Sequence, residues 1–192
     1  MVRSAVLAAF ATTLSYPAFA QDVPQLPVIE LRVEVIGTTL ADFTARMDEY
    51  AALRQSLQAG LPALRVTDRP EEIHQAEQLL AARIRQARAG ARRGDIFTAE
   101  IRRGFRQLLR GVTTEVTCDA IEEDNPGEFP YQVNNAYPKG KPLSTVPAAV
   151  LAVLPRLPDD VYYRFLERDL ILHDSRANII LDRIDDAIHC HD

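Results

Sequence analysis

The sequence predicts an α+β fold, in which a helical N-terminal half packs against a small C-terminal antiparallel β-meander. Through residues 39–123, apolar side chains recur mostly at three- and four-residue steps, the spacing of amphipathic helices. Three short β-rich runs follow at 162–166, 170–172 and 179–181, and polar turn residues separate them. Because an isolated hairpin is only marginally stable in water, we expect the helices to cover one face of this sheet.

The first 20 residues have the three parts of a secretory signal peptide. Arg3 gives a positive start, residues 5–14 are apolar, and Ala18 and Ala20 form a small-x-small cleavage site. The apolar run is too short to span a bilayer, and no later run is long enough to do so. We therefore predict cleavage after Ala20 and export of a soluble protein to the periplasm or the medium.

The rest of the chain divides into a leader, residues 21–37, and a single α+β domain, residues 38–192. Within the leader, residues 28–36 alternate apolar and charged side chains in their middle, which predicts a half-buried strand. Within the domain we expect helices at 39–123, a loop and short helix at 124–158, the meander at 159–184 and a tail at 185–192.

The first domain helix is predicted from Leu40 to Gly60, because Gly60 and Pro62 end it in the usual order. One stripe of this helix is apolar, and we expect it in the core. The stripe consists of Leu40, Phe43, Met47, Tyr50, Leu57 and Leu61.

The second helix has the clearest start signal in the chain. Asp68 can cap it, Pro70 lies just inside it, and Glu71 completes a capping box. We expect it to continue until Gly94 ends it. Its predicted buried stripe consists of Ile73, Ala76, Leu80, Ile84, Ala87 and Ala91.

A third, shorter helix is expected at 98–110, followed by one or two turns that carry Cys118. Gly104 lies in its middle, where glycine costs up to about 1 kcal/mol relative to alanine, so we expect a close contact with another helix there. Residues 125–147 are rich in Pro and Gly and form a predicted loop. Aromatic residues within 129–137 indicate that this loop is packed rather than disordered.

The chain carries 22 basic and 27 acidic residues, and this net charge of −5 lacks the basic excess typical of nucleic-acid-binding proteins. Arginines nevertheless crowd into the second and third helices. Two interpretations stay open: they complement helix dipoles and form salt bridges, or they present a basic surface to anionic envelope material or an acidic protein partner. The candidate surface consists of Arg85, Arg88, Arg92, Arg103, Arg106 and Arg110.

Two cysteines, Cys118 and Cys190, are present. In an oxidising compartment, an even pair most simply forms one disulfide. We predict that this bond ties the C-terminal tail to the middle of the chain.

A second interpretation of the tail is metal binding, by His189 and His191 with His173 from the meander. Adjacent ligands at a chain end make a weak chelate, and an oxidised Cys190 cannot add a thiolate. The sequence therefore favours a stapled or solvated tail, and a metal-handling protein is the alternative function.

No catalytic residue and no cofactor are predicted. Phosphate-binding loops, the nucleophile elbow, H-E-x-x-H and C-x-x-C are all absent from the sequence. Asp169, Asp174 and Asp182 bracket the strands, where turn and solvated roles are expected. If they converged in one pocket, a hydrolase with a carboxylate site would be a third function.

The C-terminal third carries the pattern YRF…RDLIL.D..ANIILD.I, preceded by Val133-Asn134 and by the segment 142–147. This pattern resembles the C-terminal segment of exported bacterial proteins of unknown function. A fainter likeness links the meander to small periplasmic metal-homeostasis proteins. The resemblance implies export and a meander, and it assigns no activity and no site residues.

We therefore expect an exported binding or scaffolding domain of the bacterial envelope rather than an enzyme. A protein or anionic envelope partner would use the arginine-rich helices or the aromatic loop. Nucleic acid is excluded as a partner by export and by the absence of exposed aromatics among the arginines. The oligomeric state is not indicated by any pattern.

Overall fold

A computed structural model describes residues 27–61, 68–127 and 129–190 of the chain. The predicted signal peptide and its cleavage site lie outside these residues, as does His191. Among the residues described, no helix combines the length and the apolar character needed to cross a membrane.

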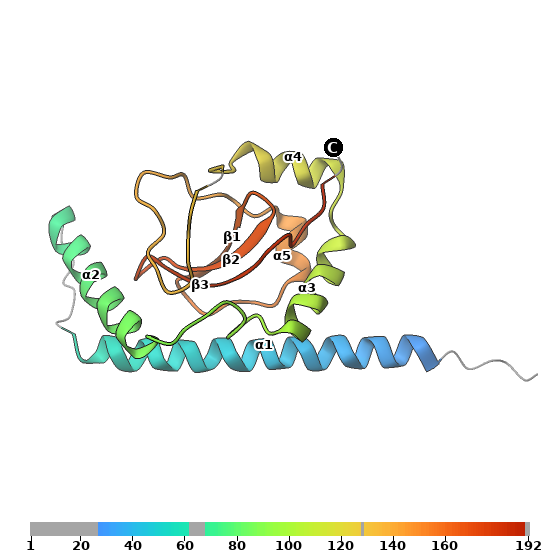
Figure 1. The fold of residues 1–192 in the computed structure, drawn as a ribbon, viewed down its shortest axis with the longest axis horizontal. Helices are drawn as coiled ribbons and strands as arrows, with labels where there is room; N and C mark the ends of the chain where they lie inside the picture. The colour runs from blue at the N-terminus through green and yellow to red at the C-terminus, as the bar shows by residue number, and fades with distance from the viewer. Residues whose placement is uncertain (1–26, 62–67, 128, 191–192) are drawn as a thin grey trace, which may run out of the picture.

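The predicted α+β class is confirmed, and the elements follow one another as helices and then strands (Figure 1). The helices are α1 (Pro27–Ala59), α2 (Pro70–Ala87), α3 (Ala99–Arg110), α4 (Glu115–Glu123) and α5 (Ala148–Val153). The strands are β1 (Val161–Leu166), β2 (Asp169–Asp174) and β3 (Ile179–Ile184).

The three strands form the predicted antiparallel meander, in the order β1-β2-β3. A β-bulge interrupts the pairing of β2 with β3 at Leu172 and His173, so that Leu172 faces Asp182 and His173 faces Ile180. The extra residue on β3 is therefore Leu181. Because a bulge breaks the alternation of side chains, Leu181 and Asp182 both lie on the helix-facing side of the sheet.

Helices cover one face of the sheet, as predicted. Figure 1 shows α1 running along one side of the molecule, with α3 standing between α1 and α4. The Phe43 ring of α1 packs against Phe97 and Phe105 at centroid distances of 5.5 and 4.8 Å, and Tyr163 of β1 lies 6.4 Å away. The stripe of α1 thus forms the centre of the core with α3 and the sheet.

The opposite face of the sheet is covered by the loop between α4 and α5. Tyr137 is buried there against Ile171 and Ile180, and Phe129 and Tyr131 pack around them. The prediction that this loop is packed is therefore confirmed. The fold has three layers: helices, sheet and loop.

The predicted strand at 28–36 is wrong, because α1 begins at Pro27 and includes these residues. A strand needs a neighbour for its backbone groups, whereas a helix satisfies them within its own segment. Both edges of the sheet already have partners. Asn134 and Asn135 exchange backbone hydrogen bonds with Ile180 at β3, and Ser144 bonds the backbone of Phe165 at β1.

The second helix is shorter than the sequence indicated, since α2 ends at Ala87 and not near Gly94. The residue before its first turn is Arg69, and no side chain caps it, so the predicted capping box is wrong. Ile73 is also wrongly predicted as core, because it is 47% exposed. At its end the Asn134 side chain donates to the Arg85 and Arg88 carbonyls, and further along Asp182 of β3 binds the backbone N–H groups of Gly94, Ile96 and Phe97.

The third helix is confirmed, with Thr98 accepting a capping bond from the Ile101 N–H. The predicted close contact at Gly104 is confirmed as well, because a Cβ there would lie 3.0 Å from the Thr39 methyl carbon. The expected helical turns around Cys118 form α4, and Cys118 is bonded to Cys190 as predicted.

Candidate functional site

Asp174, at the end of β2, is fully buried and joins the sheet to α1. Its carboxylate accepts a 2.5 Å hydrogen bond from the Tyr50 hydroxyl and pairs with the Arg54 guanidinium at 3.3 Å. It also accepts the backbone N–H groups of Arg176 and Ala177, which fixes the turn into β3. The predicted turn role is therefore confirmed, but the expected exposure to solvent is wrong.

Asp182, on β3, is the second fully buried carboxylate. It accepts the backbone N–H groups of Gly94, Ile96 and Phe97 at 2.8–3.1 Å. Gly94 has a φ of 96°, a conformation that suits glycine and lets the turn wrap around the carboxylate. Asp182 thus anchors the segment between α2 and α3 to the sheet, and its predicted solvent exposure is also wrong.

These two aspartates do not form an acid–base pair open to a substrate. Each is bonded by several donors of the protein itself, and neither lines any of the cavities described below. Tyr50 lies beside Asp174, and burial, with the neighbouring carboxylate, raises the pKa of its hydroxyl. The cluster is suited to holding layers together, and Asp169 lies apart from it at the other end of β2.

The histidines considered as metal ligands are not gathered at one place that the structure describes. His173 is 2% exposed, and its Nε2 lies 3.0 Å from the Asn178 side-chain oxygen, under the ring of Tyr137. Burial lowers the pKa of His173. His189 lies at the chain end beside Cys190, which is oxidised. Within the described ranges, no group of three or more His, Cys, Asp or Glu side chains is arranged to hold a metal ion.

Two of the six candidate surface arginines have roles within the fold. Arg88 donates to the Leu181 carbonyl at 3.1 Å and packs on the Tyr50 ring, and burial lowers its pKa. Arg106 donates to the carbonyl oxygens of Asp185 and Asp186. The other four are exposed: Arg85, Arg92, Arg103 and Arg110. They belong to separate elements, since Arg85 lies on α2, Arg92 in the segment before α3, and Arg103 and Arg110 on α3, which stands apart from α2 in Figure 1.

A cavity of about 490 Å³ lies between the aromatic loop and the sheet, within the range of about 300–1,000 Å³ that ligand sites occupy. Its lining residues come from the loop, the β1–β2 turn and β3. They are Gly127, Phe129, Pro130, Tyr131, Gln132, Asn135, Ala136, Leu166, Glu167, Asp169 and Arg183.

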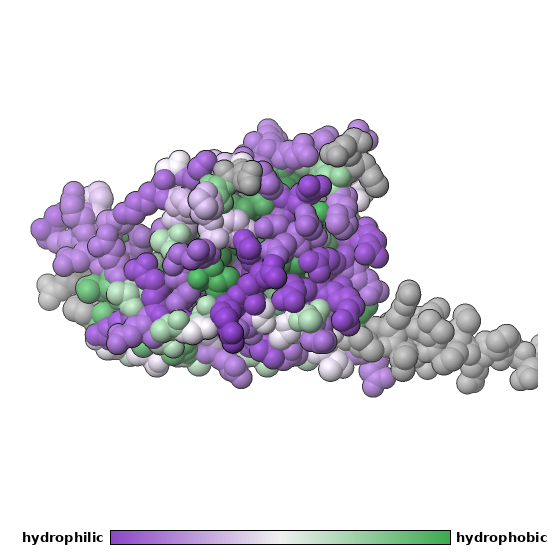
Figure 2. All heavy atoms as spheres, in the orientation of Figure 1, coloured by the Kyte–Doolittle hydropathy of each residue, from purple (hydrophilic) through white to green (hydrophobic). Residues whose placement is uncertain are grey.

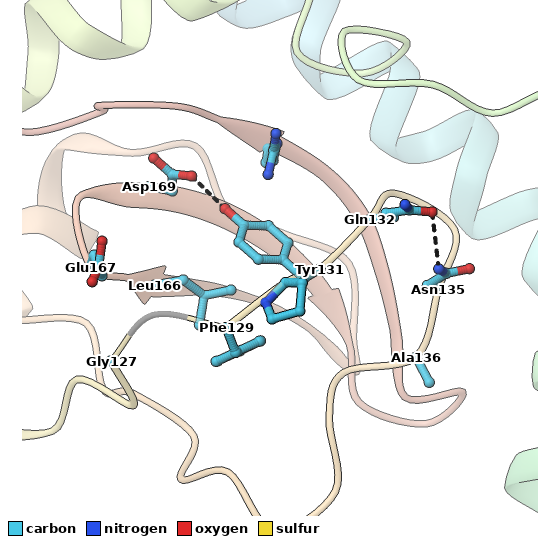
Figure 3. Close-up of a pocket in the computed structure, with 11 residues that line it drawn as sticks. Gly127, Phe129, Tyr131, Gln132, Asn135, Ala136, Leu166, Glu167 and Asp169 are labelled. Atoms are coloured by element: carbon cyan, nitrogen blue, oxygen red, sulfur yellow. Dashed lines mark hydrogen bonds between the residues drawn. The ribbon is translucent and has the colours of Figure 1, made fainter.

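Tyr131 lies across the centre of this cavity (Figure 3). Glu167 and Asp169 lie toward one side of its ring, and Gln132 and Asn135 lie toward the other. The Tyr131 hydroxyl donates a 2.5 Å hydrogen bond to Asp169, and the Arg183 guanidinium stacks on its ring at 4.8 Å. Burial, with the bond to Asp169, raises the pKa of Tyr131, so this hydroxyl stays protonated.

The loop that carries the cavity is held by side-chain hydrogen bonds to the rest of the fold. Asn134 donates to the Arg88 carbonyl on one side, and Tyr137 donates to the Pro142 carbonyl within the loop. Asn125 binds both backbone groups of Glu167, which has a φ of 51°. The cavity is therefore formed before any ligand arrives.

A second cavity of about 340 Å³ adjoins the first, because Gly127 and Glu167 line both. Its other lining residues come from α4, the loop and the tail next to the disulfide. They are Ile121, Glu122, Asn125, Arg168, Ile188 and Cys190. The two cavities together make a furrow along the side of the loop.

Sequence reasoning identified the aromatic loop but missed Glu167, Asp169 and Arg183 as parts of the same site. The predicted meander could have brought these residues together, because Glu167 lies in the β1–β2 turn, Asp169 begins β2, and Arg183 lies on β3, the strand next to β2. The alternation of β3 was hidden by the bulge, which reverses the expected face of Arg183.

Comparisons with known proteins add nothing to this geometry, because no family model, no curated protein and no solved structure matches the chain. The resemblance of the C-terminal third to exported bacterial proteins stays a prediction. The function must be argued from the site itself.

Proposed function

We propose that this protein is an exported, non-catalytic binding domain of the bacterial envelope, and that the cavity between the aromatic loop and the sheet is its ligand site. The observation that carries the proposal is a ligand-sized cavity whose walls are fixed in advance by side-chain hydrogen bonds. A preformed site binds without the cost of ordering its own residues.

The chemistry of the lining supports binding over catalysis. The described lining residues include no Ser, Thr, Cys, Lys or His, so the carboxylates of Glu167 and Asp169 are the groups on these walls that could act as nucleophile or base. The protonated Tyr131 is a poor nucleophile, and Asp169 is already engaged by it. Aromatic and amide side chains beside a few charges are typical of recognition.

Export is supported by the signal-peptide pattern, and the disulfide is compatible with an oxidising compartment. In the orientation of Figure 2 hydrophilic residues predominate, and hydrophobic ones form small separate areas. A ligand recognised mainly through polar groups suits this surface.

The proposal is tested by sedimenting the purified mature protein with isolated envelope material. The wild type is expected to sediment with it, and the variant Ala136→Trp, which fills the exposed wall of the cavity, is expected to remain in the supernatant. The control variant Arg103→Ala/Arg110→Ala alters the competing basic surface on α3 and should sediment like the wild type. Normal sedimentation of Ala136→Trp, or loss of sedimentation in the control, would rule out this cavity as the site.

A further inference from the structure

We infer that the ligand is a neutral, hydroxyl-rich oligosaccharide, bound along the furrow formed by the two adjoining cavities. This inference rests on the proposed function and specifies its ligand class. Charge balance, hydrogen-bonding capacity, the available apolar surface and the state of the backbone each contribute to it.

The charges of the site disfavour an anionic ligand. Asp169 is satisfied by the Tyr131 hydroxyl and by the Asp186 N–H at 2.9 Å, and Arg183 pairs with Asp185 at 2.9 Å. Glu167 is the exposed carboxylate, and it pairs with no cation among the residues described. An anionic ligand would be repelled by Glu167, whereas hydroxyl groups can pair with this carboxylate and with the Arg183 guanidinium.

The polar groups require a ligand that both donates and accepts hydrogen bonds. The exposed amides of Gln132 and Asn135 bond to each other at 3.4 Å and keep further N–H and C=O capacity for a ligand (Figure 3). The Glu167 carboxylate only accepts, and the Arg183 guanidinium only donates. A hydroxyl can satisfy any of these partners, because it donates one hydrogen and accepts through its lone pairs. Sugar rings carry several hydroxyls around one rim.

The apolar part of the site fits the other surface of a sugar ring. Phe129 and Tyr131, with ring centroids 5.9 Å apart, present half-buried rings at the cavity, and the exposed Pro130 lies between them in the sequence. The C–H groups on the face of a sugar ring are apolar and can pack on such surfaces, while its hydroxyls reach the polar side chains.

The backbone around the furrow argues against an extended peptide. Peptides commonly bind by adding a strand to a free sheet edge. Here the N–H and C=O groups of Ile180 are paired with the loop, and both backbone groups of Glu167 are bonded by Asn125. Recognition therefore depends on side chains, which suits a saccharide.

The second cavity adds volume and polar side chains to the first, without its aromatic rings. Beyond the shared Glu167 it offers the carboxylate of Glu122 and the guanidinium of Arg168. A further sugar unit of the same chain would therefore meet a carboxylate and a guanidinium there.

The test titrates the disulfide-bonded mature protein with cellohexaose, maltohexaose and N-acetylated chitohexaose by calorimetry, with a neutral hexapeptide mixture as comparison. At least one hexasaccharide is expected to bind, and its trimer more weakly. The variants Glu167→Gln and Gln132→Ala/Asn135→Ala should each weaken binding at least about tenfold, or about 1.4 kcal/mol. Their controls, Glu49→Gln on α1 and Gln107→Ala on α3, are exposed outside the furrow and should bind normally.

Failure of all three saccharides to bind overturns the inference, and so does binding that the furrow variants leave unchanged. If envelope sedimentation depends on the cavity but only the peptides compete with it, the proposed function stands and the ligand class is wrong. If the bound hexasaccharide is cleaved, the ligand class stands and the non-catalytic part of the proposed function is wrong.

Discussion

The Cys118–Cys190 disulfide should account for a large share of the stability of this domain. Replacing both residues with serine removes a cross-link between α4 and the tail across a sequence separation of 72. In the chain-entropy model, removing a cross-link that closes a loop of this length lowers the free energy of unfolding by about 4 kcal/mol. Domains of ordinary stability have about 5–15 kcal/mol in total, so this loss is readily measured.

The native contacts of the tail should survive without the bond. The Ala187 N–H donates to the Arg168 carbonyl at 2.8 Å, and Arg106 donates to the Asp185 carbonyl at 2.7 Å. We therefore expect the double variant to fold with the same circular dichroism spectrum, and to unfold at a lower denaturant concentration. Most of the difference should come from the unfolded chain, which gains freedom.

The assay is urea unfolding at pH 7, followed by far-ultraviolet circular dichroism, with and without a thiol reductant. Reduced wild type should match Cys118→Ser/Cys190→Ser, and the variant should not respond to the reductant. A difference below about 1 kcal/mol between oxidised and reduced wild type would refute the reasoning, because loop closure alone predicts about four times as much. Two alkylatable thiols in the exported protein would refute the disulfide itself.

Three further predictions concern the sheet. Because burial lowers the pKa of His173, the unfolded chain binds more protons than the folded chain below about pH 6.5. The free energy of unfolding should therefore fall by up to about 1.4 kcal/mol for each pH unit below that value, and urea titrations from pH 7 to 5 should show a shallower fall for His173→Gln. Asp182→Ala leaves three backbone N–H groups of the segment before α3 without their acceptor and should lower the free energy of unfolding by about 3–5 kcal/mol. A decrease of less than about 1 kcal/mol would contradict the anchoring role of Asp182. Ser144→Ala removes both hydrogen bonds to the Phe165 backbone and should lower that free energy by about 1–3 kcal/mol, whereas equal stability in thermal unfolding would show that water replaces the hydroxyl.

The sequence predicted those parts of the fold that depend on local pattern. The strands of the meander could be recognised because their apolar runs are bounded by turn residues, and Glu167 and Asn178 do occupy left-handed turn positions. The stripe through Phe43 and Met47 identified the core face of α1. These features depend on neighbours a few residues apart, which a single sequence displays.

The buried aspartates could not be predicted in the same way. An Asp after a strand reads as a solvated turn residue, and only the folded chain shows that Tyr50 and Arg54 lie opposite Asp174. The end of α2 was misjudged for a related reason. The helical pattern continues to Ala91, but the carbonyls of Arg85 and Arg88 bond to the Asn134 side chain, and Asp182 binds the backbone of Gly94, Ile96 and Phe97, partners that lie far away in the sequence.

The paired edges of the sheet explain both why residues 28–36 do not form a strand and why an extended peptide is not the proposed ligand. An alternating segment becomes a strand only where a sheet offers an open edge, and here Ser144 bonds the β1 edge while the loop pairs with β3. The same closure leaves the sheet few free backbone groups with which to recognise a peptide. What the loop and the sheet present instead is a set of amide, carboxylate, guanidinium and aromatic side chains, and the hydroxyls and ring faces of the proposed saccharide can pair with them.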